Sequence, residues 1–434
     1  MIMSRFWRLT LLVLVGFFAL GTEVDAGGLY LYEVGSNDVG LAGAGYAARA
    51  EDAATVFTNP AGMTRLDQPA VMAGAQPMYL HLAFNPDGNT SAVAGRLPGG
   101  ASADDGDTSG WLPAGGLYYV HPVNDRLRLG LALNGYFGLS LDYEDDWVGR
   151  YYVREATLQA AAIQPAVAWK VNDWLSVGLG VAAIYGILDE KIAVNNIAPA
   201  LADGELEVSD EDWTVQFNLG LLVEPRQGTR FGVTYLSEAD LDFSDRVEFS
   251  GLGPGLETAL GSRGLLDDKL DLGMTMPQAV MFSLYHKFTD RLALMANLGW
   301  QDWSRFGRVD VSVSSDTTSS LTTDLGYDDT WHAALGAQYR ISDAWELTGG
   351  VAYDSAMLDE DEVTPALPVG DTWRFGLGTR YAWSQDVSLS GAYELAWSGD
   401  IDMDVARGPL AGRVSGTYED TALHVVYMAI DWRF

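Results

Sequence analysis

The chain has 434 residues, of which 59 are acidic and 26 basic, and its formal net charge is −33. A chain this acidic offers no basic stripe to neutralise phosphates, so nucleic acid is excluded as a partner. The absence of cysteine suits passage through an oxidising compartment.

Residues 1–26 predict a cleavable export signal. Arg5 and Arg8 give a positive start, residues 9–20 form an apolar run, and Ala26 is a small residue of the kind that a signal peptidase reads. The alternative, a membrane anchor, is disfavoured because the run is shorter than the ~18–20 residues that a spanning helix needs. We expect cleavage after Ala26.

The segment 27–68 does not alternate like a membrane strand and is rich in glycine and alanine. Small residues let a chain pack closely against a barrel wall, so the composition indicates a plug, or hatch, inside a pore. Asn59-Pro60-Ala61 predicts a helix start, because Asn can cap and Pro fits the first helical position. Taken alone, the tripeptide would also fit a surface turn. The glycines at 40–45 lack the strand, helix and lysine context of a phosphate loop.

From residue 69 onward the chain alternates with period two. In residues 127–133 every odd position is leucine, whereas the even positions are Arg, Gly and Ala. Period two places the two sets on opposite faces of a strand. The apolar face would meet lipid and the small or polar face would line a lumen. A soluble β-sandwich is disfavoured because it would need a large apolar interior face.

The alternating runs predict an all-β fold: a 14-stranded antiparallel transmembrane β-barrel over residues 69–434, with the small N-terminal hatch inside its lumen. Short Asx-containing links are typical of periplasmic turns and the longer links of outer loops. The chain ends on Phe434, which resembles the C-terminal signal of bacterial outer-membrane barrels. The predicted strands are 69–83, 113–122, 127–141, 153–170, 174–188, 212–224, 229–243, 277–288, 291–313, 331–341, 345–354, 372–383, 387–398 and 420–434.

Motifs along the mature chain resemble the FadL family (OMPP1/FadL/TodX) of outer-membrane transporters for long-chain fatty acids and other hydrophobic compounds. They are Gly27-Gly28-Leu29-Tyr30-Leu31-Tyr32-Glu33, Gly40, Gly45, Asp52, Asn59-Pro60-Ala61, Gly135-Tyr136-Phe137-Gly138-Leu139, Trp147-Val148-Gly149-Arg150-Tyr151, Trp174-Leu175-Ser176-Val177-Gly178-Leu179-Gly180, Met276-Pro277, Trp303-Ser304 and Pro368-Val369-Gly370-Asp371. The resemblance implies a monomeric channel in the bacterial outer membrane. Its partners would be the surrounding lipid and hydrophobic small molecules such as fatty acids, hydrocarbons and detergent-like lipids, taken up passively.

The resemblance also implies which residues act. A tail that includes Gly27, Gly28, Leu29 and Leu31 would line an internal ligand pocket. Gly135, Tyr136, Phe137 and Gly138 would form a lateral gate, where a kinked strand lets the ligand leave sideways into the membrane. Glycines in a strand permit a bulge, although they could also relieve crowding at a bend.

One departure concerns the ligand's charge. Family members that carry fatty acids place basic residues in the pocket, and the matching positions here are Ile192 and Thr323. Lys191 lies one residue away, but one step along a strand turns a side chain to the other face. Lys191 is therefore only a candidate carboxylate partner. Arg150 and Arg154 are possible substitutes for it, although both could instead be exposed loop or barrel-rim charge. The pattern favours neutral hydrophobic ligands, because burying an unpaired carboxylate is unfavourable.

No catalytic residue, metal ligand or cofactor site is predicted. The five histidines are scattered over different strands, and none has a lipase-like spacing to Ser and Asp. An outer-membrane lipid hydrolase is thus a weak alternative. A general porin is the second alternative, but an open pore would not need a plug of this length.

Overall fold

The structure is a computed structural model that describes residues 35–91, 106–196, 201–262, 266, 269–306, 308–314, 319–324, 326–359, 362–407 and 411–434. The predicted signal and the tail residues Gly27, Gly28, Leu29 and Leu31 lie outside this part of the chain. Among the helices that these ranges contain, none is long and apolar enough to cross a membrane.

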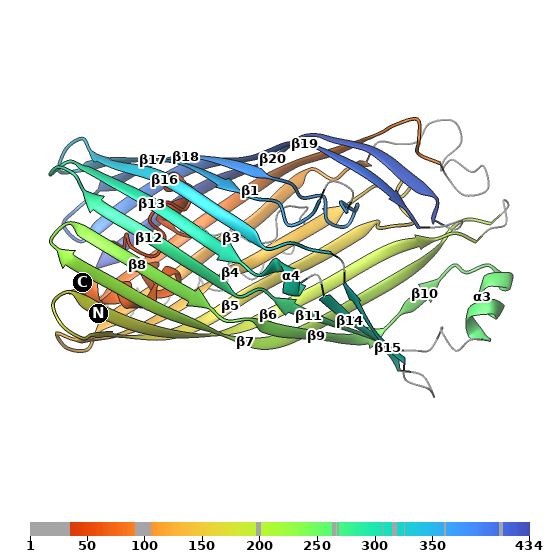
Figure 1. Cartoon of the computed structure of the whole chain (residues 1–434), viewed down its shortest axis with the longest axis horizontal. Helices are drawn as coiled ribbons and strands as arrows, with labels where there is room; N and C mark the ends of the chain where they lie inside the picture. The colour runs from red at the N-terminus through yellow and green to blue at the C-terminus, as the bar shows by residue number, and fades with distance from the viewer. Residues whose placement is uncertain are drawn as a thin grey trace, which may run out of the picture.

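Fourteen antiparallel strands close into a barrel (Figure 1). Consecutive strands pair in order around the ring, and β20 returns to pair with β1. Each of the fourteen predicted runs contributes one barrel strand, so the predicted fold class is confirmed. The strands are β1 (Ala70–Pro86), β3 (Gly110–Pro122), β4 (Leu127–Asp142), β5 (Glu155–Lys170), β6 (Leu175–Val194), β7 (Gly204–Arg226), β8 (Thr229–Leu236), β12 (Ala279–Lys287), β13 (Leu292–Gln301), β16 (Thr330–Arg340), β17 (Trp345–Asp354), β18 (Thr372–Ala382), β19 (Val387–Ala406) and β20 (Arg413–Arg433).

The two faces of the wall differ as the alternation predicts. In β4, Leu129 is 48% exposed on the outside, whereas Arg128 is 3% exposed and faces inward. Trp169 and Trp174 are exposed where β5 and β6 meet at a short turn, the level at which aromatic side chains suit the membrane interface. The wall therefore presents an apolar band to lipid and small or polar residues to the lumen.

Two predicted strands were too long. The run 229–243 is split into β8 and β9 (Ala239–Arg246), and the run 291–313 is split into β13, the single-turn helix α4 (Trp303–Phe306) and β14 (Arg308–Ser314). Apart from Leu236, the apolar residues keep to odd positions on both sides of the first break, from Phe231 to Phe243, so periodicity could not reveal it. Across the second break the apolar residues change from mainly even positions, ending at Trp300, to odd positions, starting at Val309.

The separated pieces form a second sheet, which we call the outer sheet. Its order is β9, β11 (Lys269–Met276), β14 and β15 (Ser319–Asp324), and it lies at the end that carries the long loops (Figure 1). The remaining elements of that end are β2 (Gly106–Asp107), β10 (Glu248–Ser250) and helix α3 (Pro254–Gly261).

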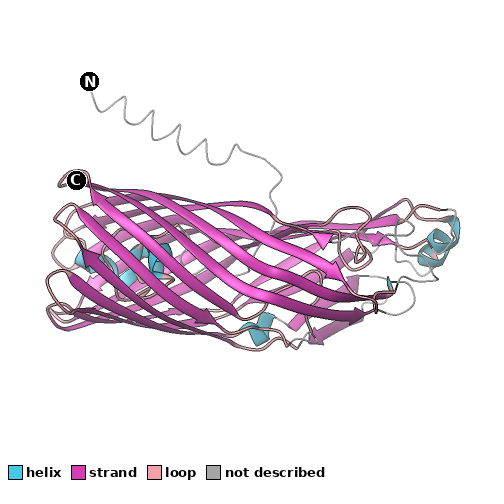
Figure 2. Cartoon of the chain, turned by 90° about the horizontal axis from the view of Figure 1, so that it is seen from above, coloured by secondary structure: helices cyan, strands magenta, loops and turns pink. Residues whose placement is uncertain are grey.

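Residues 35–68, the described part of the hatch, lie inside the barrel near the end with short turns (Figure 2). They contain the 3-10 helices η1 (Asn37–Leu41) and η2 (Pro60–Arg65) and the short helix α2 (Thr55–Thr58). Nearly all of this segment is buried. The barrel admits it because glycines in seven strands leave the inner wall bare where hatch atoms approach: Gly130, Gly178, Gly220, Gly232, Gly336, Gly350 and Gly376.

Candidate functional site

The hatch turn is built around Asn59. Its backbone is extended, Pro60 follows at the first position of η2, and its side-chain oxygen accepts a hydrogen bond from the Ala61 amide at 3.1 Å. The Asn59 amide group donates to the Ala47 carbonyl at 2.7 Å and to the Leu221 carbonyl in β7 at 3.0 Å. One side chain therefore caps a helix, closes the hatch on itself and fixes it to the wall.

Two paired glycines receive this turn. Gly178 of β6 and Gly220 of β7 are cross-strand partners. A Cβ on Gly178 would lie 2.3 Å from the Ala61 nitrogen, and one on Gly220 would lie 2.1 Å from the Asn59 side-chain oxygen. Both distances are far below van der Waals contact, so the turn can dock only where the wall has no side chains.

Arg49 is the charged centre of the hatch. Its guanidinium lies 2.9 Å from Asp38 and 2.7 Å from Asp52, and Asn37 donates to Asp52 at 2.9 Å. Burial raises the pKa of Asp38 above its usual range. Burial would also raise the pKa of Asp52, but the charge of Arg49 and the Asn37 hydrogen bond lower it below its usual range. The buried cluster ties η1 to the turn that precedes α2.

Glu51 carries the hatch network to the barrel. Its carboxylate lies 3.3 Å from Arg230 of β8 and accepts a hydrogen bond from Gln338 of β16 at 2.9 Å. Its carbonyl accepts from Arg433 of β20 at 2.7 Å. One hatch residue is thus held by three separated strands. Burial would raise the pKa of the Glu51 carboxyl, but the charges of Arg230 and Arg49 lower it below its usual range.

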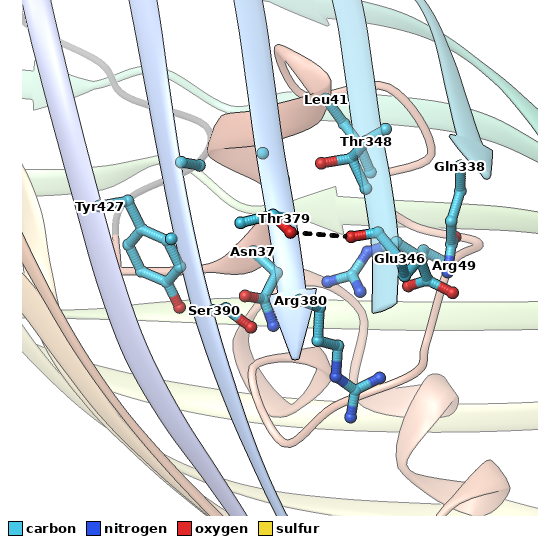
Figure 3. Close-up of a pocket in the computed structure, with 13 residues that line it drawn as sticks. Asn37, Leu41, Arg49, Gln338, Glu346, Thr348, Thr379, Arg380, Ser390 and Tyr427 are labelled. Carbon is cyan, nitrogen blue, oxygen red and sulfur yellow. Dashed lines mark hydrogen bonds between the residues drawn. The ribbon is translucent and has the colours of Figure 1, made fainter. Parts of the chain in front are cut away.

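A small pocket with polar lining residues lies between the hatch and strands β16 to β20, beside their direct contacts (Figure 3). Hatch residues Asn37 and Arg49 face wall residues across it, and Thr379 donates to the Glu346 carbonyl at 3.2 Å. Glu346 and Arg380 also line a cavity of about 200 Å³ at the barrel mouth with short turns. The hatch therefore leaves a polar space on this side of the lumen.

The predicted gate segment contains a bulge at Tyr136. Gly135 pairs with Ala161 and Phe137 pairs with the adjacent Ala160, so Tyr136 is an extra residue in β4. A bulge bends its strand and interrupts the ladder. A Cβ on Gly138 would meet only the Gln159 side chain, at 3.5 Å, so crowding does not account for that glycine.

At the same level the wall has a gap in its backbone ladder. Both strands are described in full, and β3–β4 pairing ends at Gly116 and Asn134. Beyond that pair, residues 110–115 of β3 pair only with β1, and residues 135–142 of β4 pair only with β5. The contact resumes where the Asp142 amide donates to the Thr108 hydroxyl at 2.8 Å. Pro113 suits the unpaired edge because it has no N–H to leave unsatisfied.

An apolar pocket lies directly behind this gap. The Tyr136 hydroxyl donates to the Gln216 side chain of β7, and the Tyr136 ring meets the Phe57 ring of the hatch edge-on. Every lining side chain is neutral. The lining residues are Tyr136, Phe137, Gln216, Met276, Pro277, Trp303 and Phe306. The family-like motifs pointed to five of these, whereas Gln216 and Phe306 carry no signal in the sequence.

The structure does not bring the candidate carboxylate partners to this pocket. Lys191 lies 2.8 Å from Glu155, Arg154 lies 2.6 Å from Glu205, and Arg150 lies 2.9 Å from Asp203. Each cation is thus already paired with a carboxylate near the long-loop end.

The two aligned positions add no charge to the pocket. Ile192 is half-buried in β6, and Thr323 belongs to β15, with its side chain outside the described part of the structure. Within the described ranges, no three His, Asp or Glu side chains are grouped as metal ligands.

Known proteins match this chain over most of its length. A sequence profile for the family "Outer membrane protein transport protein (OMPP1/FadL/TodX)" matches residues 18–434. The "Long-chain fatty acid transport protein" of Escherichia coli is 26% identical over 396 residues, which cover 85% of this chain and 86% of that protein. "Outer membrane protein P1" of Haemophilus influenzae is 29% identical over 369 residues, which cover 76% of this chain and 78% of that protein.

Solved structures share the fold. A Pseudomonas aeruginosa FadL homologue superposes with a TM-score of 0.82 at 20% identity, covering 94% of this chain and all of that one. The Pseudomonas putida toluene transporter TodX superposes with a TM-score of 0.66 at 14% identity, covering 95% of this chain and 99% of that one. The profile match and the closed barrel confirm an outer-membrane location and a transport protein rather than an enzyme. The chain belongs to the OMPP1/FadL/TodX family of outer-membrane transport proteins.

Proposed function

We propose that this protein is a channel for the passive uptake of hydrophobic compounds, which leave it sideways into the outer membrane. The observation that carries the proposal is the coincidence of two features: the β3–β4 ladder gap and the apolar pocket share Tyr136 and Phe137. An apolar solute that enters lipid through the wall never has to cross the water below the membrane.

The hatch supports a gated rather than an open channel. It lies inside the barrel near the end with short turns, and its Phe57 ring contacts Tyr136 in the bulge. A rearrangement of the hatch would therefore act directly on the gap. A general porin needs an unobstructed aqueous lumen, so large steady ionic currents through single channels would favour that alternative.

For the ligand we propose neutral hydrophobic compounds, such as hydrocarbons, over free fatty acids. The pocket behind the gap is lined only by neutral side chains, and the three candidate cations are already bound by carboxylates. A fatty-acid carboxylate in that pocket would be buried without a counter-charge, which costs several kcal/mol, on the order of 3 or more. The relatives are named for both ligand classes, so their names do not decide between them.

Uptake in cells that lack their own channel tests the proposal. We expect a labelled neutral aromatic hydrocarbon to enter faster than a labelled long-chain fatty acid. Lys191→Ala should leave both rates unchanged, as should the control Lys170→Ala, whose ion pair with Asp173 lies at a short turn. Strong fatty-acid uptake that collapses only in Lys191→Ala would overturn the neutral-ligand assignment, whereas no uptake of either compound would overturn the channel itself.

A further inference from the structure

Four neighbouring barrel strands stop at one level. Leu236 of β8 pairs with Ala279 of β12, Ala279 pairs with Gln301 of β13, and Gln301 pairs with Thr330 of β16. These four residues form a single row across the wall, and each is the last residue of its barrel strand on the long-loop side. The interruption is therefore a line across the wall rather than an isolated bulge.

Beyond this row the same four segments continue into the outer sheet. Its ladder restarts at the pair Ala239 and Met276 and runs on through β14 and β15. The outer sheet and the barrel are two separately hydrogen-bonded sheets. Within the described residues they are joined by the short links 237–238, 277–278, 302–306 and 326–329 (Figure 1). A row of short links between two intact sheets is the geometry of a hinge.

At the link level the backbone ladder is reduced to isolated bonds, such as the one from the Asp302 amide to the Gln278 carbonyl at 3.0 Å, and side chains make the further contacts. Tyr235 donates to the Gln278 side-chain oxygen at 3.0 Å, and Gln278 donates to the Asp302 carboxylate at 2.9 Å. Arg305 of α4 lies 3.5 Å from Glu238, and both side chains are about half exposed. Bonds of this kind yield more easily than a continuous ladder, because each contributes only about 0.5–1.5 kcal/mol.

Carboxylates also hold the β9 edge of the outer sheet to the barrel. The backbone pairing of β7 with β8 ends at Asn218. Farther along β7, Asp212 accepts a hydrogen bond from the Asp242 amide at 2.8 Å, and Asp210 accepts one from the Ser244 amide. This seam is closed by two side-chain bonds, which we call the carboxylate latch.

The hinge line and the seam enclose the apolar pocket. Met276 and Pro277 lie at the second link, and Trp303 and Phe306 belong to α4 in the third. On the inner face of β9, Leu241 and Phe243 are 1% exposed and lie over Gly186 of β6, where a Cβ would meet Leu241 at 3.0 Å. Swinging the outer sheet away would therefore open the pocket and uncover apolar surface.

We propose that the outer sheet is a hinged section of the barrel wall through which hydrophobic ligands enter the pocket. The carboxylate latch of Asp210 and Asp212 holds it shut. The proposed entrance lies at the seam between β7 and β9. It is distinct from the β3–β4 gap, which is the proposed exit. The inference rests on the proposed function, since a hinged entrance matters only if the pocket binds hydrophobic compounds.

Cross-linking across the seam tests the hinge. The chain has no cysteine, so Asp212→Cys with Asp242→Cys can be joined by a reducible bifunctional thiol reagent in whole cells. We expect uptake of a neutral aromatic hydrocarbon to fall by about tenfold or more when the link is formed and to return on reduction, because the wall cannot open. The control pair is Asp189→Cys with Ser209→Cys, which are partners in the unbroken β6–β7 ladder. Linking that pair should leave uptake unchanged.

The outcomes separate the two proposals. Unchanged uptake in the cross-linked Asp212 and Asp242 protein overturns the hinged entrance but leaves the channel intact. No uptake in the wild type overturns the proposed function instead. Equal loss in the control pair also overturns the hinge, because the effect would then not belong to the seam.

A second variant acts in the opposite direction. Asp210→Ala with Asp212→Ala removes the latch acceptors and should increase the rate at which a fluorescent neutral hydrocarbon binds the purified protein in nanodiscs, by a few-fold. Asp210→Asn with Asp212→Asn keeps a side-chain oxygen in place and should bind at nearly the wild-type rate. Alanine and asparagine variants that both bind at the wild-type rate would overturn the latch.

Discussion

The ring of Phe57 in the hatch meets the ring of Tyr136 in β4 edge-on, with centroids 5.9 Å apart and ring planes at 87°. Tyr136 is the extra residue of the bulge, and its hydroxyl reaches across to Gln216. The hatch thus touches the wall at Tyr136, one of the two residues that the gap and the apolar pocket have in common.

Phe57→Ala should uncouple the hatch from the gap. Losing the edge-on contact removes about 0.5–1.5 kcal/mol beyond the buried area, so the barrel should still assemble. We expect several-fold slower uptake with ligand still bound by the purified protein. Phe84→Ala is the control, because Phe84 is also buried but contacts the rings of Tyr418 and Trp147 instead. Uptake at the wild-type rate in Phe57→Ala would contradict the coupling.

Asn59→Ala should loosen the hatch. It removes the cap of η2 and leaves the carbonyls of Ala47 and Leu221 without their donor, a combined loss of about 2–4 kcal/mol. We expect higher single-channel conductance in planar bilayers. Gly220→Ala should also raise the conductance, because its Cβ would clash with the Asn59 side chain. Gly391→Ala is the control and should leave the conductance unchanged, because the only atom near its Cβ is the Tyr427 carbonyl oxygen, at 3.8 Å. Unchanged conductance in both Asn59→Ala and Gly220→Ala would count against the anchor.

Gly138→Val should narrow the exit. The added side chain starts in open space beside Gln159, so the strand can accept it, and its methyl groups would occupy the gap. Uptake should fall while heat-modifiable mobility on gels shows a folded barrel. Gly349→Val is a suitable control in the opposite part of the wall, where the nearest atom to a Cβ is also 3.5 Å away. Wild-type uptake in Gly138→Val would argue against lateral exit.

Deleting residues 27–31 tests the role that the family resemblance gives to the N-terminal tail. If that tail lines the pocket, its loss should weaken ligand binding by the purified protein and reduce uptake. The hatch anchor at Asn59 is retained, so conductance should stay low. Binding of equal affinity in the shortened protein would refute this role.

Acid should loosen the hatch through Asp52 and Glu51. The pKa of each carboxyl is lowered in the folded hatch, so its stabilising contribution is present above the unfolded value of about 4 and is lost as the pH falls through the folded value. The pKa of Asp38 is raised, so that residue acts with the opposite sign. A spin label at Gln68→Cys, on the exposed rim of the hatch, should become more mobile below about pH 4. In Asp52→Asn the label should already be mobile at neutral pH; identical titrations in both proteins would disprove the assignment.

Much of the fold follows from the sequence because the membrane imposes one rule on every strand. A lipid-facing apolar side chain must recur at each second position, and the run through Leu129 and Leu131 shows it clearly. The break between Leu236 and Ala239 keeps the same alternation on both sides, so a periodic pattern could not show that hydrogen bonding stops there.

The site was only partly predictable for a similar reason. The dipeptide Asn59-Pro60 predicts a helix N-cap from residue type alone, and the structure places that cap at the start of η2. The meeting of Tyr136 with Gln216 depends on how β4 and β7 face each other across the lumen, which no local pattern encodes. The pairing of Lys191 with Glu155 depends on strand register, since the two are cross-strand partners.

The contacts of Glu51 bear on the order of assembly. Its carbonyl binds the side chain of Arg433, which is 382 residues away and next to the end of the chain, and its carboxylate binds β8 and β16. These three strands come together around one point only after the sheet has curled and β20 has joined β1. An incomplete barrel therefore cannot supply all three partners of Glu51. The full set of its contacts can form only after the ring has closed, so this side of the hatch is fixed last.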